Sequence, residues 1–355
     1  MKKKTLVLTL VVLVSSELLI QVAAAEIAAG INLDGWVDTV ATGTTTNGDI
    51  PSTTDFTSSA LLRVGWEPTA KVGAVMSFRT PDDQGALHLV QAYGTVAPSD
   101  AWEMGGGKRY SPFGYFAEEP TGLYTVTNAL VINLYSISPT GVWASYTPNE
   151  HVNVTLIVAD GLATNAFPGG KASTDANDVS PGLDVVWMPS SQLALDFEVY
   201  ADPNAGGADA QNNPGNIYTF GFNAQYSTEG ILIAVEALDR ITEYAGTAST
   251  SGGDNDDYHE FSWAAVITGK LPESAPCPMS LSAQVSQYLN DQATGSASGN
   301  TLTKAQLALL TNPLTSTNFG VNIEVFYLHD GHGNTITDDA IDTYGMAIEG
   351  LFVLK

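Results

Sequence analysis

The stretch Asn216–Tyr226, with the sequence NIYTFGFNAQY, alternates apolar and polar residues with a period of two. The large apolar residues on one face are Tyr218, Phe220, Phe222 and Tyr226, and the residues on the other face are Thr219, Gly221, Asn223 and Gln225. Because successive side chains of a β-strand point to opposite sides, this period predicts a strand with one apolar side. Strands of globular proteins usually have about 5–6 residues, and this stretch is longer. It matches the roughly 9–11 residues of a tilted transmembrane strand.

The same pattern recurs along the chain. It is clear at His151–Ala159, Gln192–Ala201 and Met279–Leu289. Weaker versions occur at Gly30–Val40, Ala60–Trp66, Lys71–Arg79, Leu87–Val96, Ala101–Arg109, Gly141–Tyr146, Leu183–Met188, Ile231–Arg240, His259–Gly269, Phe319–Leu328 and Thr343–Leu354. About 15 candidate strands therefore cover the chain, with no linker that separates domains.

The connections alternate in length. Short turns such as Glu67-Pro68-Thr69 and Pro148-Asn149-Glu150 are rich in turn-forming residues, whereas long polar stretches lie at 41–58, 110–139, 160–181, 202–215 and 241–257. A transmembrane barrel has tight turns on one rim and long loops on the other. The sequence therefore predicts an all-β fold, a transmembrane up-and-down antiparallel β-barrel of about 14–16 strands.

The alternation fails near the end of the chain, where 290–317 and 330–342 are both long. Bacterial single-chain barrels have an even number of strands, so a set of about 15 has missed or added one. Within 290–317, the helical spacing of Leu302, Ala305 and Leu309 favours a short helix at Leu302–Leu310. That helix could gate or plug a pore, or simply cover a surface loop.

Composition excludes several classes of protein. The chain has 355 residues, 13 Lys+Arg, 38 Asp+Glu and one Cys. No stretch after the N-terminus is apolar enough for a membrane helix, which needs about 20 residues. The net charge of -25 argues against nucleic acid as a partner, because such binding needs a basic surface. A single Cys excludes an intrachain disulfide framework.

Residues 1–25 have the pattern of a signal peptide. Lys2, Lys3 and Lys4 precede the apolar run Thr5–Val14, and small residues end at Ala25. We expect cleavage near Ala25, which leaves residues 26–355 as a single barrel in the outer membrane of a Gram-negative-type bacterium. Without Lys2, Lys3, Lys4 and Glu17 the chain has 10 basic and 37 acidic residues, a net charge of −27.

Two neighbouring motifs resemble a known family. The run Gly106–Tyr115, GGKRYSPFGY, and the later Thr140–Asn149, TGVWASYTPN, are similar to sequences of the OmpL-like β-barrel porins. Val152–Gly161 and the early Asp34–Asp38 agree with further strands of that family. The resemblance implies an outer-membrane barrel of porin type with no catalytic residues. The chain departs from outer-membrane barrels in ending on Lys355 rather than on an aromatic residue.

Charged residues on the polar faces of the strands are candidates for the pore lining. A charge that faced lipid would cost about 2–4 kcal/mol at the centre of the membrane, so strand charges should point inward. The candidates are Arg63, Lys71, Arg79, Glu103, Arg109, Asp196, Glu198, Glu236, Arg240, Glu260, Glu324 and Glu349. The basic ones come early and the acidic ones dominate after residue 190, so the two groups either form opposed walls or merely solvate a wide pore.

Residues 110–139 form a long connection with two interpretations. The connection could fold into the lumen, with Tyr110, Phe113, Tyr115 and Phe116 on the wall and Glu118 and Glu119 facing the pore. Alternatively, Ala129–Ile137 is one more strand and the loop is short.

Metal and catalytic motifs are weak. Oxygen-rich runs at Asp254–Asp257 and His329–Asn334 could bind Ca²⁺, but neither has the pattern of an EF-hand loop. No Gly-x-Ser-x-Gly elbow occurs. We therefore expect that the protein is not an enzyme and that it binds no metal and no cofactor. The alternative is that one of these acidic loops binds Ca²⁺.

The sequence thus predicts a porin, a passive diffusion channel for small hydrophilic solutes and ions. Its partners would be outer-membrane lipid, the solutes and further copies in a homo-oligomer. The acidic excess predicts weak cation selectivity. The alternative is a structural or binding barrel that does not conduct.

Overall fold

The protein is described by a computed structural model. It describes residues 30–47, 52–80, 87–110, 114, 125–134, 139–160, 179–203, 214–244, 258–272, 278–291, 300–311, 318–331 and 340–354. Within these ranges the chain forms sixteen strands and one 3₁₀ helix, η2. None of the helical structure in these ranges is long and apolar enough to cross a membrane. The predicted signal peptide, residues 1–25, lies outside the described residues.

The strands follow one another along the chain. The first eight are β1 (Ile31–Thr46), β2 (Thr53–Thr69), β3 (Val72–Thr80), β4 (His88–Ser99), β5 (Trp102–Lys108), β6 (Thr140–Asn149), β7 (Val152–Asp160) and β8 (Ser180–Ser190). The second eight are β9 (Leu193–Pro203), β10 (Pro214–Ser227), β11 (Ile231–Tyr244), β12 (Tyr258–Lys270), β13 (Met279–Asp291), β14 (Asn300–Thr311), β15 (Phe319–Asp330) and β16 (Ile341–Leu354).

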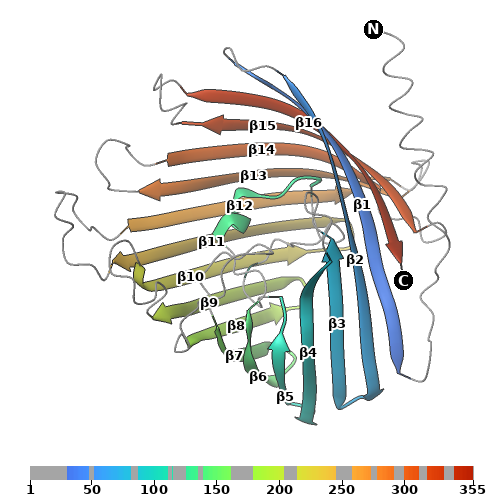
Figure 1. The fold of residues 1–355 in the computed structure, drawn as a ribbon, viewed down its shortest axis with the longest axis vertical. Coiled ribbons are helices and arrows are strands. Elements are labelled where there is room, and N and C mark those ends of the chain that lie inside the picture. The colour runs from blue at the N-terminus through green and yellow to red at the C-terminus, as the bar shows by residue number, and fades with distance from the viewer. Residues whose placement is uncertain are drawn as a thin grey trace.

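Each strand pairs antiparallel with the next, and β1 pairs with β16 to close the barrel. Figure 1 shows β1 and β16 side by side where the two ends of the sheet meet. The predicted fold class, an antiparallel up-and-down barrel, is confirmed. Each of the candidate strands from the sequence corresponds to a strand of the structure. The one strand that the sequence analysis missed is β14.

The helix expected at Leu302–Leu310 is wrong, because this segment lies within β14. It pairs with β13 and β15 over most of its length. With β14 in place the number of strands is even, and the long stretch 290–317 divides into two separate connections.

The two faces of the wall differ in polarity. Exposed large apolar side chains such as Leu156, Phe222 and Ile233 alternate along the strands with buried polar ones such as Thr155, Asn223 and Ser282. A transmembrane barrel presents its apolar side chains to lipid. The exposed apolar face is therefore the outer face, and the alternate positions form the inner face.

The two rims of the barrel differ in the length of the connections between strands. At one rim, which we call the short-turn rim, the turns are 70–71, 100–101, 150–151, 191–192 and 228–230, followed by the longer 271–278 and 312–318. The other rim, the long-loop rim, carries the remaining connections, including 109–139 and 161–179. The first five predicted short turns are confirmed. The predicted long stretch 41–58 is mostly strand, because β1 runs to Thr46 and β2 begins at Thr53.

Aromatic side chains mark the outer face near the short-turn rim. Trp66, Trp102, Tyr146, Trp187 and Tyr226 are exposed there, and the rings of Trp102 and Tyr146 lie 4.6 Å apart between centroids. Bands of Trp and Tyr are typical of the level at which a barrel crosses the lipid headgroups. The outer face thus carries the pattern of a membrane-embedded wall.

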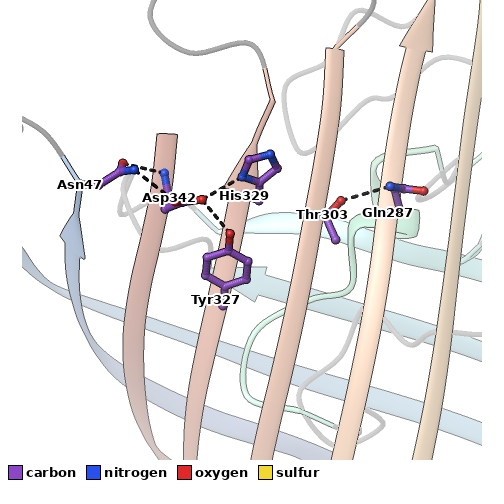
Figure 2. A network of polar contacts seen from close by, with 6 residues as sticks. All are labelled: Asn47, Gln287, Thr303, Tyr327, His329 and Asp342. Carbon is purple, nitrogen blue, oxygen red and sulfur yellow. Dashed lines mark hydrogen bonds and ion pairs between the residues drawn. The ribbon is translucent and has the colours of Figure 1, made fainter. Parts of the chain in front are cut away.

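At the long-loop rim, a polar network holds the seam between the first and last strands (Figure 2). Asn47 Nδ2 donates to Asp342 Oδ2 at 3.1 Å, and the Asp342 N–H donates to Asn47 Oδ1 at 2.7 Å. The other oxygen of Asp342 accepts from the Tyr327 hydroxyl at 2.7 Å and lies 2.8 Å from His329 Nδ1. The Asp342 carboxylate therefore joins β15, β16 and the residue that follows β1, just beyond the last pair of the β1–β16 ladder.

Candidate functional site: the barrel lumen

Part of the long connection between β5 and β6 lies inside the barrel. Residues 125–134, which include η2 (Leu130–Leu134), contact the inner faces of β11, β12, β13 and β14. Figure 1 shows this segment within the ring of strands. Of the two interpretations of this connection, the structure supports the one that folds it into the lumen for residues 125–134, and residues 129–134 of the alternative strand are not a strand. We call residues 125–134 the inserted segment.

Apolar packing fixes one side of the inserted segment. Ala129, Val131 and Leu134 are buried against Ala234 and Leu238 of β11 and against Ala264 and Val266 of β12. These inner-face positions carry apolar residues although the neighbouring lumen is polar. Burying a side chain of this size contributes about 1.5–3 kcal/mol, so the contact favours a fixed position for the segment.

Glu324 of β15 holds the start of the inserted segment. Its carboxylate accepts hydrogen bonds from the Val126 N–H at 2.7 Å and from the Thr127 N–H at 3.1 Å. The Thr127 hydroxyl donates to the other oxygen at 2.5 Å. Glu324 is fully buried, and a buried charge is tolerated only when it is well hydrogen-bonded.

The adjacent strand β14 adds a second set of contacts. Lys304 Nζ donates to the Thr127 hydroxyl at 2.8 Å and to the Asn128 carbonyl at 2.9 Å. Gln306 Nε2 donates to the Thr127 carbonyl at 2.6 Å. Sequence reasoning missed both inner-face residues, because it assigned this segment to a helix.

The end of the inserted segment is held from β11. Arg240 Nη2 donates to the Leu134 carbonyl at 2.5 Å, and Arg240 Nη1 lies 3.7 Å from Glu260 Oε2. Ser286 Oγ accepts from the Leu130 N–H at 3.1 Å. Among the described residues, the structure thus brings the predicted pore residues Arg240 and Glu260 together in an ion pair.

A further contact places the same connection on β9. The Gly114 N–H donates to Glu198 Oε1 at 2.9 Å. Asn223 Nδ2, on β10, donates to Asp196 Oδ2 at 2.8 Å. These contacts of the connection lie on the barrel wall from β9 to β15, and we call this side of the lumen the covered half. Val126 also packs against Val40 of β1 and Ala347 of β16.

Most predicted acidic residues lie in or beside the covered half and are buried. The exposed fractions are 4% for Glu198, 2% for Glu236, 9% for Glu260, 0% for Glu324 and 2% for Glu349. Arg240 is also buried. These side chains occupy the inner face, but little of their surface meets water in the lumen. Asp196 is less buried than Glu198, its neighbour on the same face.

The remaining predicted residues lie on β2–β5 or directly beside these strands, in what we call the open half. Arg63 Nη1 forms an ion pair with Asp34 Oδ1 at 3.2 Å. The guanidinium of Arg79 lies 5.4 Å from the centroid of Trp36, and that of Arg109 lies 4.6 Å from the centroid of Trp143. Lys71 and Glu103 are exposed near the short-turn rim.

Glycines shape the wall beneath Arg109. A Cβ added at Gly105 would lie 2.1 Å from the ring of Trp143, so the ring rests directly on the glycine backbone. Gly107 has a φ of +130° and would bring a Cβ to 2.2 Å from the Ala92 carbonyl, and only glycine adopts such a conformation readily. The motif at 105–107 therefore provides space for an inward-facing tryptophan and its arginine.

The structure adds inner-face residues that the sequence interpretation left out. Asp184 pairs across the ladder with Glu198, and Asp38 lies opposite Ser59. Asp184 lies on the polar face of β8, and its neighbour Leu183 lies on the apolar face. The period-two pattern could therefore have identified Asp184 from the sequence. Tyr110 packs against the wall beside Trp36 and Leu61, as the inserted-loop interpretation expects.

Several predicted residues cannot be placed. Phe113, Tyr115, Phe116, Glu118 and Glu119 lie outside the described residues, as does Asp254–Asp257. Of the second oxygen-rich run, residues 329–331 are described. Across the described part of the chain, no group of three or more His, Cys, Asp or Glu side chains is arranged to hold a metal ion.

Comparisons of sequence give no relative: no family model and no curated protein matches the chain. Comparisons of structure show the fold. The outer membrane channel DcaP of Acinetobacter baumannii matches with a TM-score of 0.65 and 13% identity, over 94% of this chain and 100% of that one. An anion-selective porin from Comamonas acidovorans matches with a TM-score of 0.63 and 10% identity, over 91% and 99%.

A trimer form of OmpT, an outer membrane protein of Vibrio cholerae, matches with a TM-score of 0.55 and 12% identity, over 91% of this chain and 100% of that one. At these identities the likeness concerns the fold alone. The chain has the fold of outer-membrane porins and channels.

Proposed function

We propose that the protein is a porin of the outer membrane of a Gram-negative-type bacterium, a passive diffusion channel for small hydrophilic solutes and ions. The observation that carries the proposal is the lumen itself. Sixteen strands are enough to enclose an aqueous channel, and the inserted segment lies against the inner faces of β11 to β14 while charged groups on β2–β5 remain accessible. We expect such a partial constriction to narrow the pore and to leave a path beside it.

Weak cation selectivity is part of the proposal. It rests on the net charge of −27 over residues 26–355. Among the accessible groups, Arg63 is paired with Asp34, whereas Glu67 and Glu103 are exposed. The opposing influence is the pair Arg79 and Arg109, which could favour anions if they line the narrowest point.

We further propose that the chain is a channel and not an enzyme, and that it needs no cofactor. Three inner-face groups show such structural roles: Glu324 anchors the inserted segment, Arg63 forms an ion pair and Arg109 contacts a tryptophan ring. The motifs at Gly106–Tyr115 and Thr140–Asn149 support a place near the OmpL-like porins, and the fold agrees with that family at the level of a porin barrel.

The orientation follows from the two rims. We propose that the short-turn rim faces the periplasm and the long-loop rim faces outside, after removal of residues 1–25. A protease site inserted after Thr174 should be cut in intact cells, and one inserted after Asn149 should be protected. Since one similar structure is a trimer, we propose a homo-oligomer in outer-membrane lipid.

A second candidate is a barrel that does not conduct. It is favoured by the buried contact of Val131 and Leu134 with β11 and β12, which fills part of the lumen. Single-channel recording in planar bilayers separates the two candidates. Discrete conductance steps with a reversal potential set by a KCl gradient are expected, and a properly folded protein that gives no steps would support the closed barrel.

A further inference from the structure

A cavity opens on the inner face at the short-turn rim, well away from the inserted segment. It has a volume of about 420 Å³ and is lined by residues of four strands, β4 to β7, and of the turns 70–71 and 100–101. Cavities that bind small molecules have volumes of about 300–1,000 Å³. The size therefore suits a solute rather than a single ion or water molecule.

Charges of both signs line this cavity. Lys71 lies in the turn between β2 and β3, Asp100 in the turn between β4 and β5, and Glu103 near the start of β5. All three side chains are exposed. Within the described residues, neither Lys71 nor Glu103 has an ion pair with another side chain. Their charges are therefore accessible to a solute.

A short polar network forms the floor between these charges. Asn153 Nδ2 donates to the Thr147 hydroxyl at 2.7 Å, and Thr155 Oγ1 donates to Asn153 Oδ1 at 3.1 Å. Ser145 Oγ lies 2.9 Å from Thr155 Oγ1. These bonds fix the orientation of Asn153 and Thr147, so their remaining donors and acceptors are positioned in advance for a ligand.

We propose that this cavity is a binding subsite for small zwitterions of the amino-acid type at the exit of the channel. An ammonium group suits Glu103 and Asp100, a carboxylate suits Lys71, and the Asn153–Thr147 pair suits the polar remainder. A simple anion would meet two carboxylates, and a simple cation would meet Lys71. Only a solute with both charges satisfies every group. The subsite rests on the proposed function and names a class of solute for it.

Binding has to be weak for a solute to leave the channel, and we expect a dissociation constant on the order of 10 mM. Exposed charge pairs contribute about 0.2–1 kcal/mol, so Lys71→Met and Glu103→Gln should each weaken binding by up to about fivefold. The matched control is Glu150→Gln, which removes a carboxylate from another cavity on the same rim and should leave the affinity unchanged.

The test is calorimetric titration of the detergent-solubilised protein with L-glutamine, with xylitol as an uncharged probe of similar size. We expect binding of glutamine and much weaker binding of xylitol, with losses confined to the Lys71 and Glu103 variants. Equal binding of xylitol, or an equal loss in Glu150→Gln, would overturn the subsite. The titration needs no ion current, so a barrel that fails to conduct but binds glutamine refutes the channel alone, and a conducting barrel without glutamine binding refutes the subsite alone.

Discussion

The covered and open halves of the lumen are built by the same alternation of residues, yet they use their charges differently. In the covered half, Glu324 is fully buried and accepts three hydrogen bonds from the inserted segment. In the open half, Arg63 and Asp34 form an ion pair and keep 28% and 41% of their side-chain surfaces exposed. A charge on the inner face can thus anchor a loop or meet the solutes, and the strand pattern is the same for both.

This difference changes how lumen charge should be counted. The sequence gives an acidic excess on the strands, but Glu198, Glu236 and Glu324 are buried. A charge that is desolvated and hydrogen-bonded acts on its immediate neighbours, whereas an exposed charge attracts counter-ions from the pore. The accessible balance between acids and bases is therefore closer to even than the sequence count.

The largest expected effect comes from removing the central anchor of the covered half. Glu324→Ala leaves the Thr127 hydroxyl and the N–H groups of Val126 and Thr127 without their buried acceptor. Breaking a buried, hydrogen-bonded charge of this kind costs about 3–5 kcal/mol. We expect the inserted segment to detach, which should raise the single-channel conductance and lower the melting temperature of the barrel.

Two variants control for this prediction. Glu324→Gln keeps one acceptor oxygen and should give an intermediate conductance. Glu67→Ala removes an exposed carboxylate from the open half and should leave both quantities close to those of the unmodified protein. If Glu67→Ala and Glu324→Ala behave alike, burial does not distinguish the two halves.

A smaller effect is expected in the open half from Gly105→Val. The added side chain would overlap the ring of Trp143, and overpacking of this kind costs about 1–3 kcal/mol. We expect the ring and Arg109 to move into the lumen and the conductance to fall. Gly106→Val is the control, because a Cβ there meets only an ordinary contact with Val142 at 3.4 Å. Equal losses in the two variants would contradict this account of Trp143.

The sequence specified the strands better than it specified the lumen. Leu193, Leu195, Phe197 and Val199 face outward as their alternation predicts, because every outward position meets the same apolar surroundings. On β14, the inner face carries Leu302, Lys304, Gln306, Ala308 and Leu310, and Thr303 points outward. The inserted segment supplies part of the surroundings of that inner face, so neither side of the strand is uniformly polar, and the period-two pattern is lost.

The same cause limits what the sequence could say of the site. Arg240 and Glu324 were predicted to point inward, and both lie on the inner face. Their contacts with Leu134 and Thr127 depend on a connection that is distant in sequence and has no strand pattern of its own. No local periodicity encodes such contacts, so the covered half could be found only from the structure.

Removing an arginine from the open half tests its influence on selectivity. Arg79 and Arg109 are half-buried, and a cation–π contact contributes about 0.5–1 kcal/mol at exposed sites and about 2 kcal/mol when desolvated. We therefore expect Arg79→Ala and Arg109→Ala to fold. Each variant removes a positive charge from the inner face. We therefore expect the reversal potential in a KCl gradient to shift toward the value of a more cation-selective channel. Lys108→Ala, which removes a charge from the same strand region, is the control. A channel that prefers anions at low salt and loses that preference in either variant would show that these arginines control the constriction.

The smallest expected effect is the dependence of selectivity on salt, and it compares the halves without any mutation. Exposed charges are screened over about 10 Å at 0.1 M salt and about 3 Å at 1 M, whereas buried charges are screened much less. If exposed acids such as Glu67 and Glu103 cause the cation preference, the ratio of K⁺ to Cl⁻ permeability should fall as salt rises. At 1 M KCl it should approach the ratio of the two ion mobilities in free solution. If the buried carboxylates of β9–β15 contribute through the barrel interior, part of the preference should persist at 1 M and be unchanged in Glu67→Ala. We expect the first result, because Glu324 directs its charge to hydrogen bonds with the inserted segment. A preference that survives high salt would instead mean that the covered half acts on permeating ions through the segment that covers it.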